Sequence, residues 1–229
     1  MRLINEAVHD LFSNGNHLYF KISGTHENDT SYVRLNEKAS ESITKDEYFK
    51  GLYGEKYKFI MHYMKENPSS SSFGEDGSVY VCPHQESVIY KFDRNGSLVR
   101  KYHEMRKTDN IFDISVQGES IWCVYTSTHT VKRFSLRDGK EELTLSEGHP
   151  GGRKGTVFTY PESIIFHDDT AFIADRGNKR IARTDLSTMK TESYMEMPEP
   201  VYRYERLGSL EYVLMNADLY ELQPGHGEG

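Results

Sequence analysis

Short apolar stretches alternate with polar, turn-forming residues along almost the whole chain. Alternation of this kind, bounded by Gly, Asn and Asp, predicts half-buried β-strands. Three segments keep one register without gaps, at 79–89, 121–131 and 171–181. Two of them are followed by Asn95-Gly96 and Asp138-Gly139, which are strong signals for tight hairpins. The pattern therefore predicts a series of antiparallel hairpins.

The hairpins recur at a regular interval. The central residues of the second strands are Tyr80, Trp122, Phe172 and Val213, at spacings of 42, 50 and 41 residues. A four-stranded propeller blade takes about 40–45 residues. An apolar stretch also precedes each hairpin and another follows most of them, which gives four strands per unit. We therefore predict an all-β fold, a β-propeller of about five four-stranded blades; the alternative is six.

The two ends of the chain complement each other. The last unit lacks a fourth strand, and the stretch Arg2–Asn5 has no partner of its own. We predict that this N-terminal strand pairs with 219–222 and closes the ring, which removes exposed sheet edges. In the first unit we expect strands at 7–12, 17–22, 32–35 and 57–63, with an insertion at about 38–56. One domain would span 1–224, and 225–229 would be a disordered tail.

The stretch 148–185 carries the strongest motif. It has a glycine-rich lead, then Tyr160-Pro161, an apolar run and the hairpin Asp175-Arg-Gly-Asn-Lys-Arg180. This unit, about a sixth of the chain, resembles an NHL repeat, the unit of a family of β-propellers. The resemblance implies the propeller fold, and because the family includes RNA-binding members it also makes RNA a possible ligand. We interpret Asp175, Asn178 and Arg180 as residues that stabilise the hairpin.

The composition and charge of the chain limit the classes of partner that we expect it to bind. The net charge of −7, from 35 acidic and 28 basic residues, argues against nucleic acid as a default partner but leaves room for a local basic patch. Cys82 and Cys123 lack metal-binding spacing, and their register places them on opposite faces of their strands, as packing residues. The chain has no long apolar run and no signal-like N-terminus, so we expect a cytoplasmic protein that does not contact membranes.

Candidate binding residues fall in two classes of loop, between the second and third strands of a blade and between successive blades. In a propeller these loops share one face around the central channel. Histidine and tyrosine there could contact a ligand, and the basic residues could attract an anionic ligand or RNA. The candidates are His84, Arg106, Lys107, Tyr125, His129, His149, Arg153, Lys154, Arg176 and Lys179.

We interpret the protein as a non-enzymatic binding module without a cofactor, with a protein or peptide as the favoured partner. The alternative is a small propeller enzyme, a hydrolase, lyase or cyclotransferase, with a metal-dependent version that would use the loop histidines. No Gly-x-Ser-x-Gly elbow and no His-x-His pair supports the alternative. The run Ser69–Ser72 lies on an inner strand and could line a polar channel.

Overall fold

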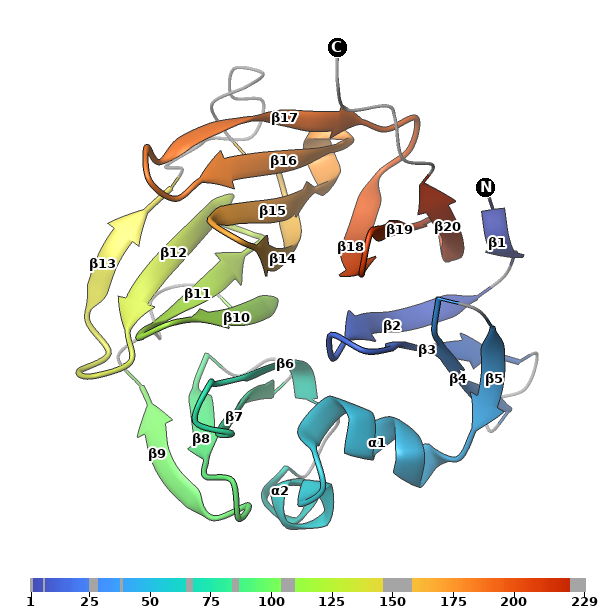
Figure 1. The fold of residues 1–229 in the computed structure, drawn as a ribbon. Coiled ribbons are helices and arrows are strands. Elements are labelled where there is room, and N and C mark those ends of the chain that lie inside the picture. The colour runs from blue at the N-terminus through green and yellow to red at the C-terminus, as the bar shows by residue number, and fades with distance from the viewer. Residues whose placement is uncertain are drawn as a thin grey trace.

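The computed structural model of the chain describes residues 2–5, 7–24, 29–37, 39–64, 68–83, 87–103, 110–145 and 158–222. Within these ranges the strands form five antiparallel four-stranded sheets, arranged as a ring around a central axis (Figure 1). The protein is a five-bladed β-propeller, which confirms the predicted fold class and the favoured number of blades.

The first strand of each blade lies innermost. Blade 1 comprises β2 (Val8–Ser13), β3 (Leu18–Ser23), β4 (Thr30–Leu35) and β5 (Ser40–Ile43). Blade 2 comprises β6 (Pro68–Phe73), β7 (Val79–Pro83), β8 (Ile89–Phe92) and β9 (Leu98–Tyr102). Blade 3 comprises β10 (Asp113–Gln117), β11 (Ser120–Tyr125), β12 (Thr130–Ser135) and β13 (Glu141–Thr144).

Blade 4 comprises β14 (Pro161–His167), β15 (Thr170–Asp175), β16 (Arg180–Asp185) and β17 (Lys190–Glu196), with the short 3-10 helix η1 (Arg176–Asn178) between β15 and β16. Blade 5 combines β18 (Val201–Leu207), β19 (Leu210–Met215) and β20 (Asp218–Leu222) with β1 (Arg2–Asn5) from the other end of the chain. The predicted closure is confirmed, because Ile4 is paired with Leu219 and Asn5 with Asp218.

The predicted fourth strand of blade 1 was wrong. Ser40–Ile43 forms that strand, and 57–63 is instead the helix α2 (Tyr57–Tyr63), after α1 (Lys45–Tyr53). Thr44 starts α1 with a reciprocal capping box to Glu47. Ile60 and Met64, four residues apart and so on one helical face, are buried in the core. This packing favours a helix where the apolar residues alone suggested a strand.

The apolar core of the described residues is divided into five clusters, one at each contact between neighbouring blades. Cys82 and Cys123 are both buried in the cluster between blades 2 and 3. They lie on opposite faces of their own sheets, as predicted, and therefore meet at the same interface. Neither cysteine forms a disulfide, and burial raises the pKa of Cys123 well above its ordinary value. No helix in the described ranges has the length and apolar character to cross a membrane.

Candidate functional site at the channel mouth

The inner strands of the propeller are irregular near their starts. The strand register breaks between Pro161 and Ser163 in blade 4 and between Val201 and Arg203 in blade 5, and similar breaks occur in blades 1 and 2. A bulge of this kind adds one residue to a strand and redirects its side chain. The extra residues in blades 4 and 5 are Glu162 and Tyr202, and both line a cavity at this end of the channel.

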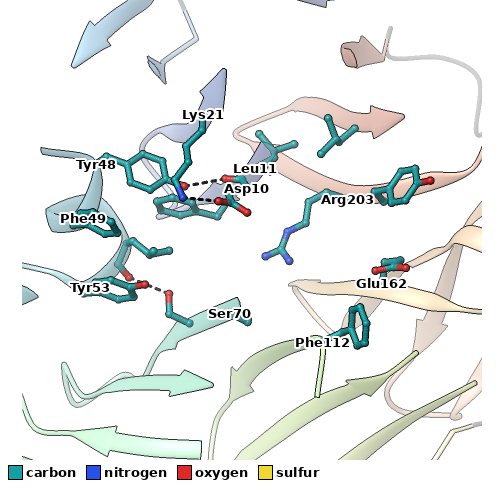
Figure 2. A pocket seen from close by; sticks show the side chains of 15 residues that line it. Asp10, Leu11, Lys21, Tyr48, Phe49, Tyr53, Ser70, Phe112, Glu162 and Arg203 are labelled. Carbon is teal, nitrogen blue, oxygen red and sulfur yellow. Dashed lines mark hydrogen bonds and ion pairs between the residues drawn. The ribbon is translucent and has the colours of Figure 1, made fainter. Parts of the chain in front are cut away.

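This cavity, the mouth cavity, has a volume of about 190 Å³ and receives side chains from all five blades. Figure 2 shows several of them around a shared space. One wall comes from α1, which contributes Tyr48, Phe49 and Tyr53. Near the start of each inner strand, the blades contribute in order Asp10, Ser70, Phe112, Glu162 and Tyr202.

The floor of the mouth cavity is the guanidinium of Arg203. Its Nη1 lies 3.0 Å from Oδ1 of Asp113, and its Nε lies 3.2 Å from Oε1 of Glu205. Burial alone would lower the pKa of Arg203, but the two carboxylates raise it above its ordinary value. Burial raises the pKa of Glu205 to about 7. Arg203 also lines a second cavity, nearer the other ends of the inner strands, as do Phe12 and Ser71.

A ladder of polar contacts joins neighbouring blades just below the mouth cavity. Equivalent positions of blades 2, 3 and 4 each accept a hydrogen bond from a backbone N–H of the next blade. The pairs are Ser70 with Ile114 at 3.0 Å, Asp113 with Ile164 at 2.8 Å and Ser163 with Tyr204 at 3.4 Å. Arg203 occupies the equivalent position in blade 5. The ladder fixes the blades, and hence the cavity walls, relative to one another.

The acidic side chains of the cavity walls are each paired with a base. Oδ2 of Asp10 lies 2.6 Å from Nζ of Lys21, and Oε1 of Glu162 lies 3.1 Å from Nε of Arg176. The side chain of Glu162 is only 12% exposed. Burial raises its pKa above the ordinary value, although the charge of Arg176 acts in the opposite direction.

The wall from α1 presents aromatic rings and one notable hydroxyl. The hydroxyl of Tyr48 donates to the backbone carbonyl of Asp10 at 3.2 Å. Tyr53 is 1% exposed, and its buried hydroxyl has no hydrogen-bond partner within the described part of the chain. A buried polar group without a partner costs about 1–3 kcal/mol. Tyr53 therefore contributes its ring to the wall, while its buried hydroxyl is not accessible to a ligand in the cavity.

Four of the predicted site residues lie in described ranges. Tyr125 and His129 are buried, at 2% and 4% exposure. His129 accepts a hydrogen bond at Nδ1 from the backbone N–H of Tyr160, at 2.8 Å. This bond joins the second-to-third-strand loop of blade 3 to the connection into blade 4. The two loop classes therefore share a face here, as expected.

The two basic residues on this face have different surroundings. Arg176 is paired with Glu162 and lies over the rings of Tyr160 and Tyr202, at 5.3 and 5.5 Å from their centroids. Lys179 is exposed, and its Nζ donates to the carbonyl of Pro198 at 3.3 Å. Arg176 thus supplies no uncompensated positive charge, while Lys179 does not reach the mouth cavity.

The other six predicted site residues lie outside the described residues, and their role as contacts stays a prediction. They are His84, Arg106, Lys107, His149, Arg153 and Lys154. Among the residues that are described, no three His, Cys, Asp or Glu side chains form a group that could hold a metal ion.

The hairpin motif of blade 4 is structural, as interpreted from the sequence. The carboxylate of Asp175 accepts hydrogen bonds from the backbone of Thr159 at 2.7 Å, from Asn178 at 2.8 Å and from Arg180 at 2.8 Å. Asp175 and Arg180 are both fully buried. These buried hydrogen bonds therefore stabilise the turn, and the motif does not line the mouth cavity.

Sequence reasoning identified only the serine run among the residues of the mouth cavity: Ser70 and Ser71 line it. It missed Asp10, Lys21, Glu162, Arg203 and the α1 tyrosines. One signal was available, because polar residues recur at the same register of successive inner strands, at Ser70, Asp113, Ser163 and Arg203. The contribution of α1 has no such signal, since the helices interrupt the repeat.

Comparison with known proteins supports the fold alone. No protein-family model and no curated protein sequence matches the chain, so the NHL resemblance is not confirmed at family level. A virginiamycin B lyase from Staphylococcus aureus has a similar structure (TM-score 0.52, 14% identity, 96% of this chain and 67% of that chain covered). So has an auxiliary nutrient binding protein from Bacteroides ovatus (TM-score 0.54, 12% identity, 97% and 61% covered).

A third similar structure is the hydrazine synthase of Kuenenia stuttgartiensis (TM-score 0.52, 14% identity). The match covers 65% of this chain and 42% of that one. This chain thus spans less than half of the hydrazine synthase chain. The similar proteins include a lyase and a nutrient-binding protein, and at such identities the likeness extends to the propeller fold only.

Proposed function

We propose that this protein is a non-enzymatic binding propeller that takes a small ligand in its mouth cavity. The observation that carries the proposal is the convergence of side chains from all five blades and α1 on one cavity floored by Arg203. Ligand sites in proteins are concave, largely preformed and lined by aromatic rings with a few oriented polar groups. The mouth cavity combines these features.

The rim provides a surface for contact with apolar parts of a ligand. Phe112 is 39% exposed and Tyr202 is 38% exposed, although both are large hydrophobic residues. The polar groups of Asp10, Glu162 and Arg203 lie around the same space (Figure 2). A protein or peptide partner, expected from the sequence, fits the same proposal if one of its side chains or its terminus enters the cavity.

The enzyme alternative rests on a different observation. Asp10 and Glu162 face the same cavity from blades 1 and 4, and burial raises the pKa of Glu162. Two carboxyl groups that face one ligand space are a common arrangement for general acid–base catalysis in hydrolases and lyases. Turnover of a bound ligand, lost in Glu162→Gln while binding is retained, would favour this alternative.

The test is a screen of small metabolites by ligand-observed NMR, with two matched variants. Phe112→Ala removes an aromatic ring at the rim, and Phe59→Ala removes a ring from α2 that is 61% exposed and does not line the cavity. We expect hits whose affinity falls about fivefold to tenfold in Phe112→Ala, since an aromatic contact contributes about 1–1.4 kcal/mol, and is unchanged in Phe59→Ala. Hits with equal affinity for both variants would place binding elsewhere and reject the proposal.

A further inference from the structure

The charges around the mouth cavity are paired before any ligand arrives. Asp10 is paired with Lys21, Glu162 with Arg176, and Arg203 with both Asp113 and Glu205. Glu205 is close to half protonated at neutral pH, because burial raises its pKa to about 7. Within the described residues, the cavity therefore has little uncompensated charge of either sign.

The paired side chains still have atoms that can donate hydrogen bonds to a ligand and atoms that can accept them. The bond of Glu162 to Arg176 uses Oε1, and the bond of Asp10 to Lys21 uses Oδ2, so each carboxylate keeps a second oxygen without a recorded partner in the described chain. Arg203 uses Nε and Nη1, which leaves Nη2 as a donor. Figure 2 shows the guanidinium of Arg203 reaching between Asp10 and Glu162.

We propose, building on the binding function above, that the ligand is a neutral polyhydroxylated molecule, a carbohydrate unit of monosaccharide size. Hydroxyl groups donate and accept at once, so adjacent hydroxyls can bridge a carboxylate oxygen and a guanidinium N–H. The C–H face of a sugar ring is apolar and fits the exposed rings of Phe112 and Tyr202. The volume of about 190 Å³ suits one such unit.

A charged ligand is disfavoured by the same pairing. A ligand anion or cation entering the cavity would lose its hydration and find no group of opposite charge that lacks a partner among the described residues. The ligand would have to break an existing ion pair. One charged side chain of that pair would then be partly buried without a counter-charge, which costs free energy. A neutral polar ligand adds hydrogen bonds without disturbing any pair.

The experiment compares neutral and charged monosaccharides by isothermal titration, with glucuronate and glucosamine as the charged probes closest in size to glucose. The neutral probes are D-glucose, D-galactose, D-mannose and L-arabinose, and the charged probes are glucuronate, glucosamine and glucose 6-phosphate. We expect at least one neutral probe to bind at least about tenfold more tightly than every charged probe, because the charged ones are penalised by desolvation. The affinity of the neutral probe should change less than about twofold between about 0.05 and 0.5 M salt, since no net charge is neutralised.

Glu162→Gln provides an independent check, with Glu55→Gln as the control at a carboxylate that is 75% exposed and outside the cavity. The variant weakens one hydrogen bond and leaves Arg176 without its carboxylate. We expect the neutral probe to bind about threefold to tenfold more weakly, the scale of a charge-assisted hydrogen bond, and glucuronate to bind more tightly than it does to the unmodified protein. The control should leave both affinities unchanged.

The outcomes separate this inference from the proposed function. If a charged probe binds most tightly and Phe112→Ala weakens it, ligand binding at the mouth stands and the neutral class is overturned. If no probe of either kind binds and the metabolite screen also finds no ligand for the cavity, both proposals are overturned. If a neutral probe binds with strong salt dependence, the balanced-charge argument is wrong.

Discussion

The guanidinium of Arg203 lies 3.0 Å from the carboxylate of Asp113, so one ion pair links blade 5 to blade 3 across the channel. These blades are not neighbours in the ring. Asp113 also accepts hydrogen bonds from Ser70 of blade 2, at 2.5 Å, and from the backbone of Ile164 in blade 4. One buried carboxylate therefore holds four blades together and positions the floor of the mouth cavity.

This relationship predicts strong coupling between the two residues. Arg203→Met leaves Asp113 as a fully buried carboxylate without its cation, and we expect a loss of about 3–5 kcal/mol in the free energy of unfolding. The double variant with Asp113→Asn should lose less than the sum of the two single variants, because the uncompensated charge is then removed. Urea unfolding of all four proteins measures the coupling. Additive losses would show that the pair does not act as a unit.

Glu205 predicts a specific pH dependence of stability. Its folded-state pKa of about 7 lies above the ordinary value of 4.5, mainly because it is buried. The folded state therefore holds this proton more tightly than the unfolded state. The resulting stabilisation is fully present below pH 4.5 and is lost as the pH rises to about 7.

Glu205→Gln removes this titration. The stability difference between the unmodified protein and the variant should fall by about 3 kcal/mol across that pH range and be constant above it. Urea unfolding at a series of pH values gives the difference curve, in which other titrating groups cancel. A difference that is flat, or that rises with pH, is incompatible with a raised pKa.

The hairpin of blade 4 should tolerate little change at Asp175. Asp175→Asn removes the charge that balances the fully buried Arg180, so we expect a loss of about 3 kcal/mol or more in stability. Asp168→Asn is the control, because the Asp168 side chain is 88% exposed and should contribute less than about 0.5 kcal/mol. Comparable melting temperatures for the two variants would argue against a structural role for the buried pair.

Closure of the ring is tested by truncation. Removing residues 1–6 deletes β1 and exposes the edge of β20, so we expect a loss of several kcal/mol, a large fraction of the stability of a typical domain. Removing 225–229, which the sequence predicts to be a disordered tail, is the control and should leave the melting temperature unchanged. An unchanged melting temperature in the N-terminal truncation would show that β1 does not hold the ring closed.

The repeat made most of this fold predictable from the sequence. The second strands of blades 2 to 5 were recognised by Tyr80, Trp122, Phe172 and Val213, and closure by Arg2–Asn5 followed from a strand missing at one end. Prediction was wrong where the repeat is interrupted, at α2. There, tertiary burial of Ile60 and Met64 on one helical face decides the structure, and a short apolar run alone does not separate helix from strand.

The candidate site was much less predictable, for a physical reason. Loop residues such as Arg176 are easy to find because loops are polar, but the mouth cavity is built from strand starts whose side chains are redirected by bulges. A register shift of a single residue decides whether the side chain of Glu162 points into the cavity or toward the other face of its strand. Pairing of charges between blades, as in Asp113 with Arg203, depends on the closed ring and has no signal in one sequence.

Amide chemical-shift mapping with a bound neutral sugar shows directly whether ligands bind at the mouth cavity. We expect the largest shifts near the starts of inner strands of different blades, on Asp10, Phe112, Glu162, Tyr202 and Arg203. Shifts should be small on the exposed residues of α2, Phe59 and Tyr63. Shifts centred on α2, or on the second cavity around Ser72 and Ser115, with none at the mouth, would contradict the account.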